Sequence, residues 1–484
     1  MWEEVDLKNN KMVDSDKGTA RKLPQYVAAL SVCLGAVAAG TVLGWTSNIG
    51  DPLEKGDLND VTADKDNQQG WIGSWMTLGA MIMCFPIGYL CDLLGRKLTM
   101  LLLIVPFTVG WLLIIFCANI EMIYVGRFIL GLAGGSFCVS APLYTSEIAE
   151  DAIRGTLGTF FQLLLVVGIL MSNIMGAYVE IKAFSIICAI IPIIFGLVFF
   201  FQPETPVYLA KKGKYDEAKK SLERFRGPAY KCDIELEEIK KALEEEKNNK
   251  VSFMESLKTT ASKKAILICF GLMFFQQLSG VNAFVFYTGN IFTTTGSSID
   301  PSQATIYVGA VQLVATFVSS QVVDRFGRRV LLMFSDFFMM IASLVLAIYF
   351  SIKPNLTQEE IENIGWIPIS SLIIFFIVFS LGYGPIPWLA SSELMPQEIK
   401  ANASSAAATF NWFLAFLVTK FYADLSNALN EYGPFYIFSA ISLAGTAFVY
   451  FLLPETKGKS QAEIQLELSG GKSEKSGIDN PAYN

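Results

Sequence analysis

Three side-chain amides lie close together in one apolar stretch of the chain, at Gln276, Gln277 and Asn282. An amide donates and accepts hydrogen bonds without carrying a charge, so it suits a neutral ligand rich in hydroxyl groups and avoids the burial of an ion. The competing role for such residues is to hold membrane helices together. Because three amides gather at membrane depth, we favour a binding site. The neighbouring Ser279 and Gly280 provide a point at which the helix can break.

The amides belong to one of twelve apolar stretches that we expect to cross a membrane as helices. The chain has 484 residues, of which 52% are apolar and 17% charged, a balance typical of polytopic membrane proteins. Roughly 20 predominantly apolar residues cross the hydrocarbon layer, and they do so as a helix because lipid offers no hydrogen-bond partners. The predicted spans lie near residues 26–47, 71–91, 98–117, 124–146, 155–177, 183–201, 265–288, 302–322, 330–351, 366–390, 402–424 and 433–453.

The predicted spans form two copies of one unit, because short charged motifs recur in the same order in both halves of the chain. The paired motifs are Asp92-Leu93-Leu94-Gly95-Arg96-Lys97 with Asp324-Arg325-Phe326-Gly327-Arg328-Arg329, Glu147 and Arg154 with Glu393 and Lys400, and Pro203-Glu204-Thr205-Pro206 with Pro454-Glu455-Thr456-Lys457. Duplicated helical bundles around a central substrate site are the architecture of secondary transporters. We therefore predict an all-α integral membrane protein with two six-helix halves. The predicted parts are a tail (1–25), a first half (26–201), a linker (202–264), a second half (265–453) and a second tail (454–484).

Lys and Arg residues are unevenly divided among the loops between the spans, and this division predicts the orientation. One set of loops is rich in them and includes the linker, which we expect to form short amphipathic helices in the cytosol. The alternate loops hold few and are expected to face outward, so both termini would be cytosolic. The sequon at Asn355 falls in an outward loop and is a candidate glycosylation site.

Other kinds of chemistry find no support in the composition. The chain has no histidine, which excludes a Ser-His-Asp triad and a histidine metal site, and its eight cysteines are spread singly. The net charge of −7, without a basic stripe outside the predicted cytosolic loops, argues against nucleic acid as a partner. We therefore expect no enzyme activity, no metal and no cofactor, and the expected partners are a small molecule and the lipid bilayer.

The motifs resemble those of the sugar porter family of the major facilitator superfamily. Besides the paired motifs, they are Gly126-Arg127, Pro142-Leu143-Tyr144-Thr145-Ser146-Glu147, Gln276-Gln277-Leu278-Ser279-Gly280-Val281-Asn282 and Gly384-Pro385-Ile386-Pro387-Trp388. The resemblance extends from residue 26 to residue 458 and is strongest to animal facilitative hexose carriers and to insect trehalose and hexose carriers. It implies the major facilitator fold and a sugar as the substrate.

The resemblance adds five residues to the expected sugar site. Indole rings can stack on the apolar face of a pyranose ring, and amides can bind its hydroxyl groups. Without the family, the isolated Gln162 would be assigned to contacts between helices. For the two tryptophans the alternative is an interfacial anchor, and their mid-span placement weighs against it. The added residues are Gln162 in the fifth span, Gln312 in the eighth, Trp388 in the tenth, and Asn411 and Trp412 in the eleventh.

Two features predict moving gates. Pro385 and Pro387 lack backbone N–H groups, so the tenth span can break against the sugar site, although a static kink is the alternative. Charged residues at the cytosolic helix ends are expected to form ion pairs that favour the outward-facing state, unless they serve only as topology signals. The gating candidates are Arg96, Glu147, Arg154, Asp324, Arg328, Gly384, Pro385, Pro387, Glu393 and Lys400.

These observations predict a facilitative carrier of a hexose in the plasma membrane, with glucose ahead of trehalose. We expect passive transport because the first span has no Asp or Glu, whereas proton-driven members of the family carry a carboxylate there. A proton–sugar symporter and a sugar sensor without transport are the remaining alternatives. The tail motif Asn480-Pro481-Ala482-Tyr483 resembles a sorting signal, which makes Tyr483 a candidate contact for an endocytic adaptor.

Overall fold

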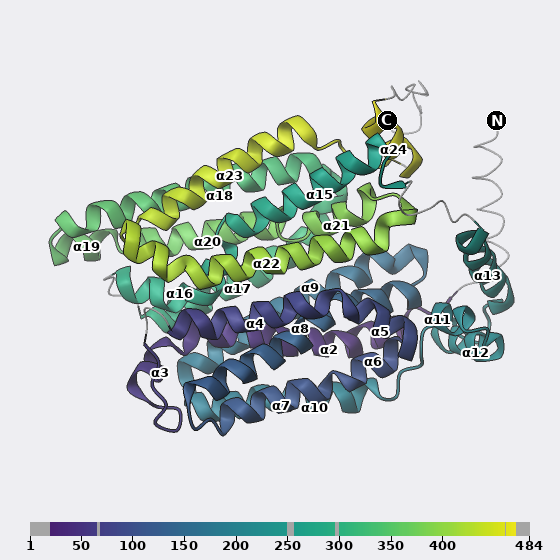
Figure 1. Cartoon of the computed structure of the whole chain (residues 1–484), viewed down its shortest axis with the longest axis horizontal. Helices are drawn as coiled ribbons and strands as arrows, with labels where there is room; N and C mark the ends of the chain where they lie inside the picture. The colour runs from purple at the N-terminus through teal and green to yellow at the C-terminus, as the bar shows by residue number, and fades with distance from the viewer. Residues whose placement is uncertain (1–19, 65–67, 249–255, 296–299, 460, 471–484) are drawn as a thin grey trace.

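The computed structural model describes residues 20–64, 68–248, 256–295, 300–459 and 461–470. Within these ranges the chain is built from helices, without a β-strand and with one isolated bridge between Leu58 and Val61. The helices form two bundles that lie side by side, one from each half of the sequence (Figure 1). The predicted all-α fold with two helical halves is therefore confirmed.

The first bundle begins with α2 (Leu23–Trp45), which has Pro24 in its first turn, where an intrahelical N–H is not needed. Buried residues occur on every side of α2, so this helix lies inside the bundle. The other elements of this bundle are η1 (Thr46–Asn48), α3 (Gly50–Lys55), α4 (Gln68–Cys84), α5 (Pro86–Leu94), α6 (Arg96–Leu102), α7 (Ile104–Ile115), α8 (Ile120–Ile148), α9 (Asp151–Tyr178) and α10 (Ile181–Phe199).

The second bundle contains helices with well-formed N-terminal caps. Asp300 accepts hydrogen bonds from the backbone N–H groups of Ser302 and Gln303 at the start of α17, and Thr357 with Glu360 forms a capping box at the start of α19. Its elements are α15 (Thr260–Leu278), α16 (Val281–Thr295), α17 (Pro301–Phe326), α18 (Arg328–Ile352), η2 (Lys353–Asn355), α19 (Gln358–Ile364), α20 (Trp366–Leu381), α21 (Ile386–Leu394), α22 (Gln397–Leu429), α23 (Gly433–Leu452) and α24 (Gln461–Ser469).

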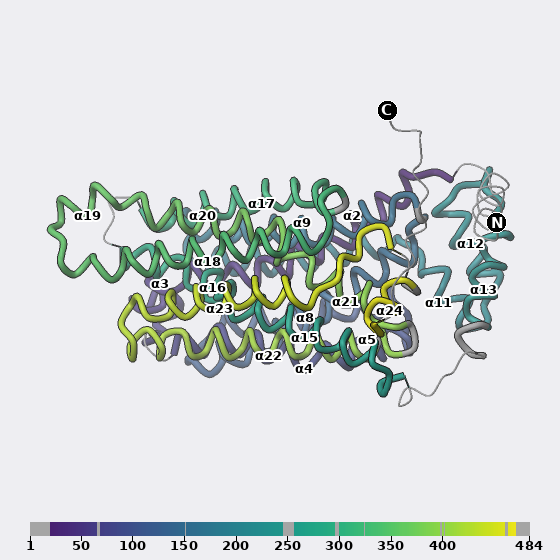
Figure 2. Tube along the Cα trace, turned by 90° about the horizontal axis from the view of Figure 1, so that it is seen from above, coloured from purple at the N-terminus to yellow at the C-terminus, as the bar shows by residue number. Residues whose placement is uncertain are grey.

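Three linker helices, α11 (Pro206–Lys211), α12 (Tyr215–Arg226) and α13 (Cys232–Asn248), pack on a small apolar core of their own. Arg226 attaches them to the first bundle, because it donates to the carbonyl of Ile148 at 2.6 Å and pairs with Glu235 at 2.7 Å. Figures 1 and 2 place these helices at one end of the molecule, termed the linker end, and α19 at the opposite or far end. The predicted helical linker is confirmed.

The helix breaks expected in the second half are present. The seventh predicted span breaks at Ser279 and Gly280, and the φ of 91° at Gly280 is one that glycine adopts without strain. The tenth breaks over residues 382–385, between α20 and α21. A further break, which was not predicted, bends α4 from α5 by 52°. Pro86 explains it, because proline has no N–H to continue the helix.

The number of membrane-crossing helices agrees with the prediction once α22 is included. In the described chain, 10 helical stretches are long and apolar enough to cross a membrane, and the bent pair of α4 and α5 raises this number to 11. The remaining predicted span lies within α22, which has 33 residues and is longer than a bilayer requires. Polar residues such as Asn411 and Lys420 lower its mean hydropathy.

Candidate functional site

Four predicted amides form one continuous chain of hydrogen bonds, termed the amide chain. Asn282 Nδ2 donates to Gln277 Oε1 at 2.5 Å, and Gln277 Nε2 donates to Asn411 Oδ1 at 2.8 Å. Asn411 Nδ2 donates to Gln276 Oε1 at 2.7 Å. Asn282 is half-buried and the other three side chains are buried. The packing of α22 on α15 brings these distant residues together without burying a charge.

The amide chain ends on the break in the tenth span. Gln276 Nε2 donates to the backbone carbonyls of Tyr383 at 2.6 Å and Gly384 at 3.1 Å. The Tyr383 carbonyl has no helical donor four residues later, because Pro387 lacks an N–H. On the other side of the break, the N–H of Tyr383 donates to Ser335 Oγ of α18 at 3.2 Å. The predicted gating residues Gly384, Pro385 and Pro387 therefore lie in or beside a break that neighbouring helices support.

Four other predicted site residues are not part of the amide chain in the described structure. Gln312 and Trp412 are buried, Gln162 is half-buried, and Trp388 is 41% exposed. Among the described hydrogen bonds, none joins the side chains of these four residues to the amide chain. Their part in a sugar site stays a prediction from the family resemblance.

At the linker end of the first bundle, Arg96 joins several helices. Its guanidinium contacts Glu147 Oε1 of α8 at 2.7 Å and Asp92 Oδ1 of α5 at 3.0 Å. Thr205, which caps α11, donates to Glu147 Oε2 at 2.6 Å. The side chains of Arg96 and Glu147 are only 5% and 10% exposed, so salt in the solvent screens this pair weakly.

The second bundle repeats this arrangement with its own residues. Arg328 contacts Glu393 Oε1 at 3.1 Å, and Thr456 donates to Glu393 Oε2 at 2.5 Å. The Arg96–Glu147 and Arg328–Glu393 pairs thus each join helix ends within one bundle. The half-buried Lys400 lies where the charge of Glu393 acts on it.

The gating roles of two further candidates stay predictions from the sequence. Arg154 is exposed at the start of α9. The side chain of Asp324 lies outside the described residues, so its predicted role stays untested.

Two glutamates of the repeated Pro-Glu-Thr motif cap the helices that begin at Arg96 and Arg328. Glu204 Oε2 accepts from the N–H of Lys97 at 3.0 Å at the start of α6. Glu455 accepts from the N–H groups of Arg328 at 2.9 Å and Arg329 at 3.1 Å at the start of α18. A carboxylate is favourable at a helix N-terminus because it satisfies the unpaired N–H groups there. The repeat of this motif is visible in the sequence, but its capping role is not.

A glycine precedes each capped helix. Gly95 has a φ of 99° and Gly327 a φ of 88°, a region that other residues rarely adopt. A Cβ at these positions would lie 2.4 Å from Glu204 Oε2 and 2.6 Å from Glu455 Oε2. The Gly-Arg step of the repeated motif therefore allows the carboxylate to reach the helix end.

The two caps differ in their electrostatic surroundings. Burial raises the pKa of Glu204, against the opposing effect of the backbone N–H groups of Thr205 and Lys97. Burial acts in the same direction on Glu455, but there the N–H groups of Lys457 and the residues that begin α18 prevail and hold its pKa below the ordinary value. The second bundle thus favours the ionised cap more strongly than the first.

The two bundles make close contacts at the far end. Two hydrogen bonds of the described residues join them, from Asn173 Nδ2 to the carbonyl of Thr305 at 3.3 Å and from Asn290 Nδ2 to Gln69 Oε1 at 3.2 Å.

Glycines allow this approach. A Cβ at Gly73 would lie 2.7 Å from Thr419 Cγ2, and a Cβ at Gly289 would lie 2.4 Å from the carbonyl oxygen of Ser47. Any larger residue at these two positions would push the bundles apart.

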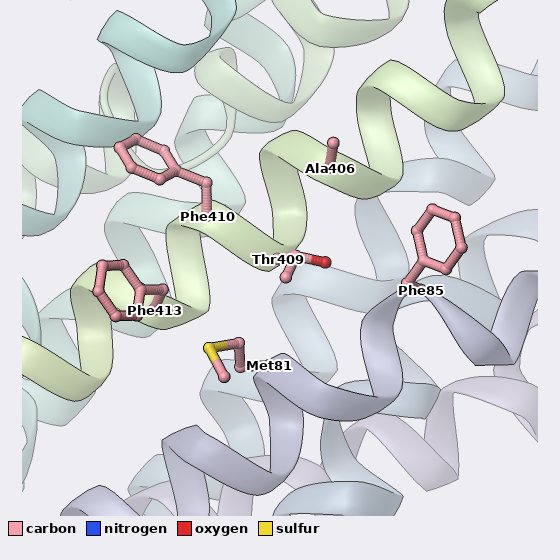
Figure 3. Close-up of a pocket in the computed structure, with 6 residues that line it drawn as sticks. All are labelled: Met81, Phe85, Ala406, Thr409, Phe410 and Phe413. Atoms are coloured by element: carbon pink, nitrogen blue, oxygen red, sulfur yellow. The ribbon is translucent and has the colours of Figure 1, made fainter.

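Nearer the linker end, an open apolar groove lies along the contact between α4 and α22 (Figure 3). At Gly155 and Gly158, on the linker-end part of α9, a Cβ would meet nothing within 4 Å. The hydrogen bonds described between the bundles thus lie at the far end, whereas the groove and these open glycine positions lie nearer the linker end. The groove is lined by Met81, Phe85, Ala406, Thr409, Phe410 and Phe413.

Arg127 of α8 is a fully buried cation that neutral groups of the first bundle satisfy. Its guanidinium donates to the carbonyls of Val42 at 2.7 Å and Ile72 at 3.2 Å, and to Thr46 Oγ1 at 2.6 Å. It also lies 5.4 Å from the centre of the Trp45 ring. Among the described residues no carboxylate pairs with it.

Two packed helical bundles, paired linker-end motifs and polar residues at broken helices define a transporter of the major facilitator class. The model of the family described as sugar (and other) transporter matches residues 20–468, and the chain belongs to this family. This membership confirms the sugar porter resemblance. Together with the long apolar helices, it confirms the prediction of a multi-pass membrane protein that belongs to a transporter family rather than to an enzyme family.

Relatives from insects cover most of the chain. The facilitated trehalose transporter Tret1 of Aedes aegypti is 39% identical over 92% of this chain and 55% of its own length. The protein of the same name from Culex quinquefasciatus is 38% identical over 92% of this chain and 86% of its own length. The chain therefore spans about half of the Aedes aegypti relative.

Solved structures share the fold. The proton:xylose symporter XylE bound to 6-bromo-6-deoxy-D-glucose has a TM-score of 0.74 at 21% identity, over 92% of this chain and 99% of that one. An inward open conformation of the xylose transporter XylE from E. coli has a TM-score of 0.75 at 20% identity, over 91% and 98%. At this identity the likeness shows the fold alone.

Proposed function

We propose that this protein is a facilitative sugar carrier with trehalose as its first candidate substrate and a hexose such as glucose as the second. The motifs favoured glucose, but the relatives at 39% and 38% identity are named facilitated trehalose transporters, which favours the disaccharide. The observation that carries the proposal is the amide chain that ends on the break between α20 and α21.

The amide chain supplies the polar groups that a neutral sugar needs. Exchange of one neutral hydrogen bond for another changes the free energy little, whereas separation of a buried ion pair is strongly unfavourable. Sugar hydroxyl groups can therefore replace amide–amide hydrogen bonds. Since Gln276 also bonds the carbonyls of Tyr383 and Gly384, a sugar that contacts Gln276 would act directly on the position of α21. This link provides the differential contact by which a ligand shifts a carrier between states.

We infer passive transport from the charges around the first helix. No Asp or Glu occurs in α2, and the nearby Arg127 is satisfied by carbonyl and hydroxyl oxygens. A proton-coupled cycle needs an acidic group that gains and loses its proton beside the moving parts. The first bundle offers Arg127 no such partner among the described residues.

We place the linker end and both termini in the cytosol, because the Lys and Arg residues gather in the loops at that end. From the groove and the open glycine positions near the linker end, we infer that the carrier in this orientation is open toward the cytosol. The pairs Arg96–Glu147 and Arg328–Glu393 are formed in this arrangement, each within its own bundle. We therefore propose that they stiffen each bundle so that it moves as a rigid body.

The plasma membrane remains the proposed location. Asn355 is exposed at the far end, which becomes the outer face in this orientation and suits a glycan. Tyr483 lies outside the described residues, so the endocytic adaptor stays a prediction from the sequence.

The direct test is counterflow of labelled trehalose and labelled glucose into proteoliposomes that hold the purified protein, with and without a pH gradient. Trehalose exchange that ignores the gradient supports the proposal. Exchange of glucose without exchange of trehalose would show that the substrate is a hexose. Sugar accumulation driven by the pH gradient would contradict passive transport.

A further inference from the structure

Asp336 is a buried acid that the proposed sugar site does not use. It lies on α18, one residue after Ser335, and its side chain has no exposed surface. Both carboxyl oxygens are buried without a hydrogen-bond partner in the described structure. Such a group inside a membrane protein is rare, because an ion there loses its hydration.

The surroundings of Asp336 contain hydroxyl groups and no described charge. The facing polar groups are the Tyr383 hydroxyl, from the break between α20 and α21, and the Ser442 hydroxyl of α23. Both hydroxyl oxygens are also buried without a described partner. Tyr383 is the titratable group that faces Asp336, and no charged group of α15, α17, α20, α21 or α23 acts on it in the described chain.

A glycine makes space for this acid. A Cβ at Gly445 of α23 would lie 2.0 Å from Asp336 Oδ2, so a larger residue there could not coexist with the carboxyl group. The fold therefore accommodates a carboxyl group at this position but gives it no cation. A neutral carboxylic acid, which can donate one hydrogen bond to a hydroxyl, is the form that fits these surroundings.

Tyr383 connects Asp336 to the amide chain. Its hydroxyl faces Asp336, its N–H donates to Ser335 Oγ at 3.2 Å, and its carbonyl accepts from Gln276 Nε2 at 2.6 Å. One residue in the helix break thus contacts both α18 and the proposed sugar site.

We propose that Asp336 is a proton-binding site whose bound proton keeps the break at Tyr383 in the arrangement that Gln276 requires. The proton is retained through the transport cycle and is not carried across the membrane. At alkaline pH the O–H bond of the acid breaks, the proton passes to solvent base, and the negative charge that stays on the carboxylate draws water into the α18–α23 contact. The break then shifts and sugar exchange stops.

The inference rests on the proposed function for its transport measurement only. Equilibrium exchange of trehalose and of glucose is measured in proteoliposomes with equal pH on both sides, from mildly acidic to alkaline pH. We expect wild-type exchange to fall by up to about tenfold per pH unit once the acid ionises. Asp336→Asn should stay within about twofold of wild type at neutral pH and show no alkaline fall, since the amide mimics the neutral acid. Asp424→Asn, at an exposed acid of α22, is the matched control and should follow wild type.

An alkaline fall that persists in Asp336→Asn would overturn the inference. So would proton-driven sugar accumulation that Asp336→Asn removes, because the proton would then be transported. Tyr383→Phe retains the backbone contacts and removes only the hydroxyl, so an unchanged pH midpoint in this variant would contradict the connection through Tyr383. This variant also carries the test if Asp336→Asn does not fold.

Thermal unfolding of the detergent-solubilised full chain provides a measurement that needs no sugar. Wild type should lose stability at alkaline pH, because the folded chain must then bury an ion or open, and Asp336→Asn should not. If neither sugar is exchanged but this difference is observed, the proposed function fails and the proton site stands. If both proteins show the same pH dependence, the proton site fails whatever the substrate.

Discussion

Gln276 on α15 donates a hydrogen bond of 2.6 Å to the carbonyl of Tyr383, a backbone group that the proline-rich break between α20 and α21 leaves without a helical donor. A side chain of the proposed sugar site therefore completes the hydrogen bonding of the proposed gate. Sugar binding and gating thus share one hydrogen bond. A substitution at Gln276 should therefore alter the position of Tyr383, and a substitution at Tyr383 should alter that of Gln276.

Replacement of Gln276 tests this relationship. Gln276→Ala removes the donor to Tyr383 and Gly384 and the acceptor of Asn411, which leaves buried polar groups unpaired. Each such group costs roughly 1–3 kcal/mol, so we expect sugar affinity in counterflow to fall by about 10- to 100-fold. Gln202→Ala, a glutamine at the linker end that bonds Ser31, is the control and should keep near-normal affinity. Equal affinity in both variants would exclude Gln276 from the site.

Charge exchange tests whether the ion pairs act within each bundle. Arg96→Glu alone should nearly abolish transport, because loss of one partner of a buried pair costs about 3–5 kcal/mol. Arg96→Glu with Glu147→Arg should recover part of the rate. The combination of Arg96→Glu with Glu393→Arg should recover nothing, since Glu393 pairs with Arg328 in the other bundle. Recovery by the cross-bundle combination would show that the pairs lie between the bundles.

The glycines before α6 and α18 should resist substitution. Gly95→Ala and Gly327→Ala introduce a Cβ at a positive φ and against a glutamate oxygen. We expect each to lower the free energy of unfolding by roughly 1–3 kcal/mol, read as a lower Tm of the detergent-solubilised protein. Gly88→Ala in α5 is the control, because its Cβ would meet nothing within 4 Å. A Tm for Gly95→Ala and Gly327→Ala equal to that of Gly88→Ala would contradict the capping geometry.

The two caps should respond oppositely to pH. Backbone N–H groups hold the pKa of Glu455 below its ordinary value, so its ionised form contributes stability above the ordinary pKa that is lost as the pH falls through the folded pKa. The Tm difference between wild type and Glu455→Gln should therefore be largest at neutral pH and shrink on acidification.

Burial raises the pKa of Glu204, so the sign is reversed there and wild type gains relative stability as the pH falls toward that value. The Tm of wild type should therefore rise relative to the Tm of Glu204→Gln on acidification. Identical pH dependence of the two glutamine variants would contradict the electrostatic difference between the caps.

Glycosylation at Asn355 tests the orientation. The residue is exposed at the far end of the second bundle, so protein made in a secretory membrane should carry a glycan there if that end faces outward. Glycosidase should increase the gel mobility of wild type and leave Asn355→Gln unchanged. Asn402 begins a second sequon, with Ser404, in the linker-end part of α22. A glycan detected there instead would reverse the orientation.

The sequence by itself determined the features that depend on neighbouring residues. Apolar length predicted the spans, and the pairs Ser279–Gly280 and Pro385–Pro387 marked two helix breaks, because glycine freedom and the missing proline N–H act locally. The cluster of three amides was also visible, since it lies in one short segment. The break at Pro86 was missed, although it depends on the same local property.

Only the tertiary structure decided which distant residues meet. Asn411 reaches between Gln276 and Gln277 across more than a hundred residues, Glu455 caps α18, and Asp336 faces Tyr383. Local propensity carries no information on such contacts, because they depend on how whole helices pack, rotate and approach through glycines. For the same reason, the sequence could place Arg96 and Glu147 at helix ends but could not tell whether they would pair within a bundle or between bundles.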